Sequence, residues 1–150
     1  MAASIFPMGA TLNYYGAGNC VSTPDNDFTA CGPYHVILFP SGLCMIEFIV
    51  KIETIPTTTI IGGLDKRIFE NITGKSITPI NGGNLMYYTP EGNINASLTG
   101  YGGVLVYGDL YPNYWLFARV YNTSGTSGTW APYIIPVGTH IQGTAFGKWS

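Results

Sequence analysis

Hydrophobic and polar residues alternate most clearly between positions 43 and 52. Every second position of this segment is apolar: Cys44, Ile46, Phe48, Val50 and Ile52. Met45, Glu47, Ile49 and Lys51 lie between them. A two-residue period places successive side chains on opposite faces of a β-strand, so one face of this strand is expected in a core. The apolar segment 34–39 precedes it, and the Pro-Ser-Gly turn between the two predicts a β-hairpin.

A second strand is predicted over residues 113–121. Tyr114, Leu116, Ala118 and Val120 alternate there with Trp115, Phe117, Arg119 and Tyr121. Both faces are therefore largely apolar, which is typical of a central strand or of one at an interface.

Shorter apolar segments occupy much of the remaining chain. Segments 84–89, 93–98 and 104–107 are separated by Thr-Pro-Glu-Gly and Tyr-Gly-Gly, which favours a meander, and further strands are expected at 130–135 and 139–146. The 20 glycines and 10 prolines are spread over the whole length, which favours short strands over helices. Only the segment 63–71 has apolar residues at helical spacing, and it allows a turn or two of helix.

The predicted fold class follows from these short apolar segments and the glycines and prolines that separate them. We expect an all-β, jelly-roll-like antiparallel β-sandwich of about eight strands, with at most one short helix, and we expect residues 1–150 to form a single domain.

Composition adds an expectation about partners. Only 9% of the residues are charged and 46% are hydrophobic, so apolar surface is expected to remain exposed after one copy has folded. A closed homo-oligomer is the usual way to cover such surface, and a dry, very stable monomer is the alternative. The net charge of −2 and the scattered basic residues argue against nucleic-acid binding. No signal peptide and no membrane-spanning segment are recognised.

The three cysteines lack metal-binding spacing, and no cofactor motif occurs, so we expect neither a metal nor a cofactor. Cys20 and Cys31 flank a polar segment, and an oxidising medium would allow a disulfide between them. Cys44 lies within an apolar segment and is interpreted as a small buried residue.

Catalytic residues are not recognisable, and the chain is not expected to be an enzyme. His35 lies inside an apolar strand and His140 lies beside a turn, where structural histidines are common. Glu91 and Asp109 are the nearest approach to the carboxylate pair of a glycoside hydrolase, but loop charges explain them more simply.

Aromatic residues near loops are the remaining candidates for binding, because an aromatic ring can stack on the C–H face of a sugar while neighbouring carboxylate and amide groups accept hydroxyl hydrogens. On this basis the predicted ligand-binding residues are Glu91, Asp109, Tyr111, Asn113, Trp115 and Trp130. The alternative is that these rings fill the sandwich core or a subunit contact.

From about Ser76 onward the chain resembles the C-terminal head or tip domains of bacteriophage receptor-binding and tail-fibre proteins. The resemblance lies in Ile-Thr-Pro-Ile (77–80), Tyr-Tyr-Thr-Pro-Glu-Gly-Asn-Ile (87–94), Gly-Tyr-Gly-Gly (100–103), Trp-Leu-Phe-Ala-Arg-Val-Tyr (115–121) and the segment 135–147. It covers roughly half of the chain. The resemblance implies a jelly-roll head, a homotrimer about a three-fold axis, and binding of a host cell-wall saccharide at or between subunits.

Three functions follow, in order of preference. The first is a viral receptor-binding or adhesion module at a phage tail fibre, baseplate or capsid surface, in contact with other virion proteins and a host glycan. The second is a structural virion or filament protein, such as a capsid decoration subunit, without a ligand. No coiled-coil or shoulder segment precedes the head in this sequence, which is expected either for a shortened form of a longer protein or for a small separate virion protein such as a capsid decoration or baseplate component. The third, a small polysaccharide-cleaving enzyme using Glu91 and Asp109, ranks last.

Overall fold

The computed structural model describes residues 9–22, 29–54, 63–88, 102–106, 112–117 and 138–150. In chain order the elements are β1 Leu12–Asn19, β2 Val21–Ser22, β3 Thr29–Leu38, β4 Leu43–Thr54, β5 Gly63–Asp65, α1 Lys66–Thr73, β6 Ile77–Tyr88, β7 Gly102–Val106, β8 Tyr114–Phe117 and β9 His140–Trp149. The structure is therefore mostly β, as predicted, with one short helix among the described residues. The predicted strands 93–98 and 130–135 lie outside those residues.

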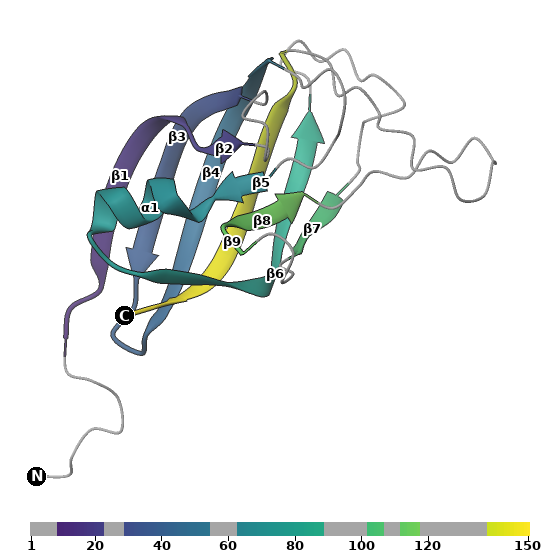
Figure 1. Cartoon of the computed structure of the whole chain (residues 1–150). Coiled ribbons are helices and arrows are strands. Elements are labelled where there is room, and N and C mark those ends of the chain that lie inside the picture. The colour runs from purple at the N-terminus through teal and green to yellow at the C-terminus, as the bar shows by residue number, and fades with distance from the viewer. Residues whose placement is uncertain (1–8, 23–28, 55–62, 89–101, 107–111, 118–137) are drawn as a thin grey trace, which may run out of the picture.

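The described strands pair in one antiparallel order, β1-β3-β4-β9-β6-β7-β8-β5-β2, which is not a closed barrel. We call the first six strands of this order the large sheet. Strand β7 pairs with β6 on one side and with β8 on the other, so the ladder continues from the large sheet into the short strands. Figure 1 shows β2, β5, β8 and α1 lying across one face of the large sheet. The arrangement is a β-sandwich-like architecture of antiparallel strands.

The predicted hairpin over residues 34–52 is confirmed. Strands β3 and β4 pair antiparallel, with Val36 opposite Ile46. The turn is closed by backbone hydrogen bonds from Phe39 N to Leu43 O at 2.9 Å and from Gly42 N to Phe39 O at 3.0 Å. Gly42 has a φ of 88°, in the left-handed region that glycine adopts without strain, which explains the turn at this position.

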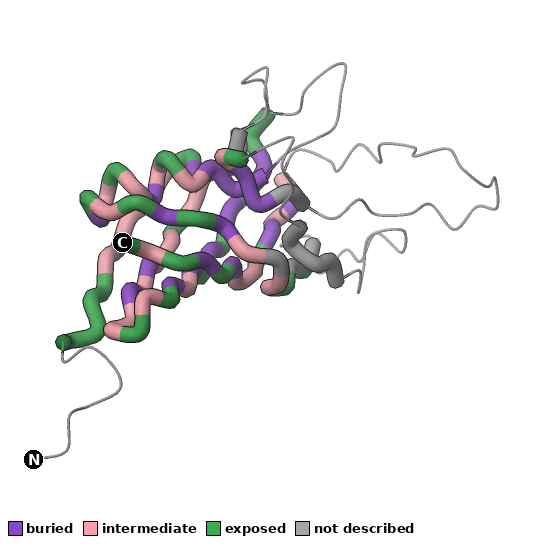
Figure 2. The backbone as a smooth tube through the Cα atoms, turned by 60° about the horizontal axis from the view of Figure 1, so that its bottom comes forward, coloured by how far each residue is buried: buried purple, intermediate pink, exposed green. Residues whose placement is uncertain are grey.

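The hydrophobic core lies between the two layers (Figure 2). All five apolar residues that alternate along β4 are buried: Cys44, Ile46, Phe48, Val50 and Ile52. From the opposite layer, Leu64 of β5, Phe69 of α1 and Trp115 of β8 enter the same cluster. The core therefore contains side chains from the large sheet, which are buried at every second position of β4, and side chains from the short elements of the opposite layer.

Helix α1 begins immediately after β5, at a cap made by Asp65. The Asp65 carboxylate accepts hydrogen bonds from Arg67 N at 3.0 Å, Arg67 Nε at 2.9 Å and Arg67 Nη2 at 2.7 Å. These hydrogen bonds raise the pKa of the Arg67 guanidinium above its ordinary value. The helix ends at Gly74, whose φ is 67°. No described helix is long and apolar enough to cross a membrane.

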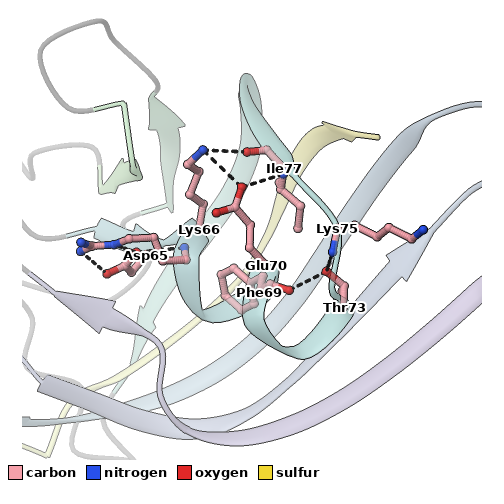
Figure 3. A network of polar contacts seen from close by, with 8 residues as sticks. Asp65, Lys66, Phe69, Glu70, Thr73, Lys75 and Ile77 are labelled. Atoms are coloured by element: carbon pink, nitrogen blue, oxygen red, sulfur yellow. Dashed lines mark hydrogen bonds and ion pairs between the residues drawn. The ribbon is translucent and has the colours of Figure 1, made fainter.

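A second set of polar contacts ties α1 to β6 (Figure 3). Glu70 Oε1 accepts from Ile77 N at 2.8 Å and lies 3.3 Å from Lys66 Nζ. Lys66 Nζ also donates to Ile77 O at 3.1 Å. Lys66 and Glu70 therefore link the helix to Ile77, the first residue of the next strand. Leu64 was grouped with the predicted helix, but it lies in strand β5, because the helix starts only at the Asp65 cap.

The chain passes from the large sheet to the second layer at Cys20. Asn19 Oδ1 accepts hydrogen bonds from Val21 N at 3.3 Å and from Ala30 N at 3.1 Å, which fixes this crossing. All three cysteines are free thiols in the structure. Cys20 is buried in the core, whereas Cys31 lies opposite Lys51 on the other face of the sheet. No disulfide joins Cys20 and Cys31 in the structure, and a bridge would need their β-carbons to face one another.

Thiol titration tests this arrangement. Burial raises the pKa of Cys20 to about 12 and that of Cys44 to about 11, so both thiols should be inert in the folded protein. The half-buried Cys31 also has a raised pKa, through desolvation and its hydrogen bond to Glu53, but it is accessible. We expect a disulfide reagent to modify one thiol slowly in the native protein and all three in guanidinium chloride. A single reactive thiol after unfolding without reductant would instead show a Cys20–Cys31 bridge.

Candidate functional site

One face of the large sheet is not covered by any described element. We call it the open face. It carries apolar side chains that are well exposed, namely Tyr15, Leu43, Ile49, Met86 and Phe146. Strand register aligns them into cross-strand rows: Ile37, Met45 and Phe146 form one row. Exposed apolar surface remains, as the composition predicts.

Four side chains on this face form what we call the Tyr15 cluster: Asn13 and Tyr15 of β1, His35 of β3 and Glu47 of β4. Tyr15 lies directly opposite His35, and His35 lies directly opposite Glu47. The three neighbouring strands therefore place an aromatic ring, an imidazole and a carboxylate in one row, and Asn13 lies one step along β1 in the adjoining row.

Contacts within the cluster fix the imidazole. The Tyr15 and His35 rings are stacked, with centroids 4.4 Å apart and planes at 11°. His35 Nε2 donates to Asn13 Oδ1 at 2.8 Å, and His35 Nδ1 lies 3.4 Å from Glu47 Oε2. The contact with His35 involves one carboxylate oxygen of Glu47, Oε2.

Tyr15 presents one ring face to the outside. The distance between the ring centroids of Tyr15 and His35 is close to the spacing of neighbouring strands, about 4.8 Å, so each ring lies over its own strand and faces the other ring. The second face of the Tyr15 ring therefore points away from β3, toward the side of β1 that pairs with no described strand. Tyr15 is 73% exposed, the largest value among the exposed large hydrophobic residues described.

This arrangement suits recognition of a polyhydroxylated ligand. An open aromatic face accepts the C–H face of a sugar ring, and its hydroxyls can donate to a carboxylate or an amide oxygen nearby. The Glu47 side chain is 55% exposed and can reach such a ligand. In the part of the chain that the structure describes, no group of three His, Cys, Asp or Glu residues could hold a metal ion.

The structure places the residues predicted from loop aromatics elsewhere. Glu91, Asp109, Tyr111 and Trp130 lie outside the described residues. Asn113 is half-buried in the turn before β8, and its backbone oxygen accepts from Lys66 N at 2.9 Å. The described part of the predicted set therefore reduces to Asn113 and Trp115, which are adjacent to β5 and α1 and not to the open face.

Trp115 is a core residue and not a surface ring. It is 0% exposed, its ring packs edge-on against Phe69, and its Nε1 donates to Phe146 O at 2.8 Å. A buried ring with a satisfied N–H has no free face for a sugar. For this residue the alternative considered from the sequence, that the ring fills the core, describes what the structure shows.

The Tyr15 cluster is not recognisable in the sequence, because its members come from three strands. From the sequence His35 is expected to be a structural histidine, and Tyr15 is not among the predicted binding residues. One signal was available: in the predicted hairpin, a turn closed by Phe39 and Leu43 places His35 opposite Glu47. The contribution of β1 was not visible in the same way, because nothing in the sequence sets its register against β3.

No protein-family model, no curated protein and no solved structure matches this chain. The geometry of the open face is therefore the structural basis for a functional proposal.

Proposed function

We propose that this protein is a non-catalytic adhesion module that binds a saccharide through the Tyr15 cluster. The observation that carries the proposal is the exposed ring of Tyr15, held in place by His35 beside the Glu47 carboxylate. An exposed, positioned aromatic ring next to hydrogen-bonding groups is a typical element of a specific binding site.

The resemblance adds the biological setting to this proposal. It supports a viral, phage-type receptor-binding protein at a tail tip or capsid surface, with a host cell-surface glycan as ligand. It also supports a jelly-roll head assembled as a homotrimer. The antiparallel, sandwich-like arrangement of the described strands is compatible with such a head.

Replacing Tyr15 tests the proposal. A glycan array of bacterial cell-wall polysaccharides and cell-surface glycans identifies the strongest binder, and titration calorimetry with that glycan measures affinity. We expect Tyr15→Ala to weaken binding at least tenfold, because the stacking face is lost, and Glu47→Gln to weaken it severalfold, because a charged acceptor is lost.

Two further variants serve as controls. Tyr15→Phe keeps the stacking face and should retain most of the affinity. Met86→Ala removes an exposed apolar side chain of β6 on the same face and should bind like the native protein. A folded native protein that binds no glycan on the array, or a Tyr15→Ala variant with native affinity, would overturn the proposal.

A structural role as a virion or filament subunit is the second candidate. The exposed apolar rows of the open face favour it, because assembly would bury them. Light scattering distinguishes the two roles: polymers that grow with concentration favour the structural subunit, and a discrete oligomer that binds glycan favours the adhesion module.

A further inference from the structure

Strand β1 is an edge of the large sheet, with no described strand on its outer side. In the order of described strands β1 and β2 are the two ends, and β2 has only two residues, whereas β1 has eight. The sequence of β1, Leu-Asn-Tyr-Tyr-Gly-Ala-Gly-Asn, contains no charged residue and no proline. Proteins commonly protect edge strands with lysine, proline or a bulge, because a free edge is a template for another strand. Strand β1 has no protecting charge or proline.

We propose that strand β1 pairs antiparallel with strand β1 of a second copy of the chain, and that this pair covers the ring face of Tyr15 that would bind the saccharide. The second part rests on the proposed function, and the first part does not.

The choice of a second copy follows from charge and symmetry. An uncharged edge opposes no like charges when it pairs with itself, and the pair is related by a two-fold axis, the commonest symmetry of soluble oligomers. In antiparallel strands this axis is perpendicular to the sheet, so directly opposite residues share a face. The open faces of the two copies therefore form one continuous face. The two-fold axis passes between one residue of β1 and the same residue of the second copy.

Stacking of the two Tyr15 rings selects the register, because side-chain size alone also allows the axis at Gly16, where Tyr14 lies opposite Gly18 and Tyr15 opposite Ala17. With the axis at Tyr15, Tyr14 lies opposite Gly16 of the second copy, and Leu12 lies opposite Gly18. Each large side chain of β1 then has a glycine or alanine opposite, except Tyr15, which faces its own copy. The free ring face of Tyr15 points toward this edge, so the two tyrosines stack on one another. Aromatic pairs directly across antiparallel strands are among the favourable cross-strand pairs.

Pairing and ligand binding then compete for one ring face. The two equilibria are linked. If the ligand binds only the unpaired chain, the factor by which the ligand lowers the affinity between two copies equals the factor by which pairing lowers the affinity for the ligand. Pairing through β1 does not use surface elsewhere on the molecule, so it is compatible with a trimer formed by other surfaces. A trimer whose subunits also pair through β1 would contain six copies in one assembly.

Edge variants and light scattering test the pairing. We expect native protein to contain an even number of copies at micromolar concentration, and Ala17→Lys, which places a charge on the exposed edge, to halve that mass. Leu12→Lys should do the same from the other face of the strand. The matched control, Gln142→Lys, adds the same charge to an exposed position of β9 in the interior of the sheet, and it should keep the native mass. An odd number of native copies, or an unchanged mass in both edge variants, would overturn the proposal.

Two measurements test the covering of Tyr15. Tyr15→Ala should weaken pairing at least tenfold in the absence of any ligand, because the stacked rings are lost. The array-selected glycan at saturation should halve the native mass. A glycan that binds through Tyr15 and leaves the mass unchanged would contradict the competition. If the edge variants and Tyr15→Ala behave as expected but no glycan binds any variant, pairing stands and the proposed saccharide function fails.

Discussion

Replacing Trp115 with alanine is expected to destabilise the protein by about 4 kcal/mol, because the change opens a large cavity in the core. Trp115 is fully buried and packs against Phe69 of α1. Its N–H bonds to Phe146 O on β9, so the side chain links the second layer to the middle of the large sheet. A loss of this size is a large share of the stability of an ordinary domain. Urea unfolding followed by circular dichroism measures it.

Two comparisons separate packing from hydrogen bonding and from ligand binding. Trp115→Phe keeps most of the volume but removes the N–H that donates to the Phe146 carbonyl, and it should lower the free energy of unfolding by about 2 kcal/mol. Tyr15→Ala removes a ring that is exposed in a single copy, and at a protein concentration too low for pairing through β1 it should lower the free energy of unfolding by no more than about 0.5 kcal/mol. A Trp115→Ala variant of native stability would mean that this ring is not in the core.

Replacing Gly32 with alanine is expected to destabilise the protein by about 3 kcal/mol or more, because a β-carbon there would overlap with the carbonyl oxygen of Ile49. Strands β3 and β4 approach one another here with no room for a side chain. The overlapping atom belongs to backbone in the middle of the sheet, so it cannot move aside as a flexible side chain would. The midpoint of urea unfolding measures the loss.

Gly9→Ala is the matched control for Gly32→Ala. A β-carbon at Gly9 would have no atom within 4 Å, and the unfolding midpoint should stay close to that of the native protein. Equal midpoints for the two variants would show that the close approach of β3 to β4 is not as described.

Some of the fold could be predicted because one face of a strand is buried. Every second residue of β4 from Cys44 to Ile52 is apolar and buried, because this face contacts the core, and the hairpin of β4 with β3 follows from the turn at Gly42. Strand β6 begins at Ile77, seven residues before the predicted start at Asn84, because a bulge between Pro79 and Gly83 interrupts the alternation. Gly82 and Gly83, both with positive φ, form part of that bulge.

Strand β1 was not predicted at all, and its glycines explain why. Gly16 and Gly18 lower the β-propensity of the segment. In the structure the ring of Tyr34 on the neighbouring strand occupies the space that a β-carbon at position 16 would take. The reason for this glycine is a tertiary contact, which a single sequence does not contain. The Tyr15 cluster was missed for the same reason, since two of its members lie on β1.

Strand β9 lies between β4 and β6, although it is separated from them by at least fifty residues of sequence. During translation the ribosome therefore releases β3, β4 and β6 well before the strand that joins them. Until residues 140–149 emerge, the hairpin of β3 and β4 keeps an unsatisfied row of backbone amides and carbonyls beside β4. The large sheet cannot form completely before β9 has been synthesised. A chain that ends before residue 140 would therefore lack a central strand of the sheet, not an edge strand.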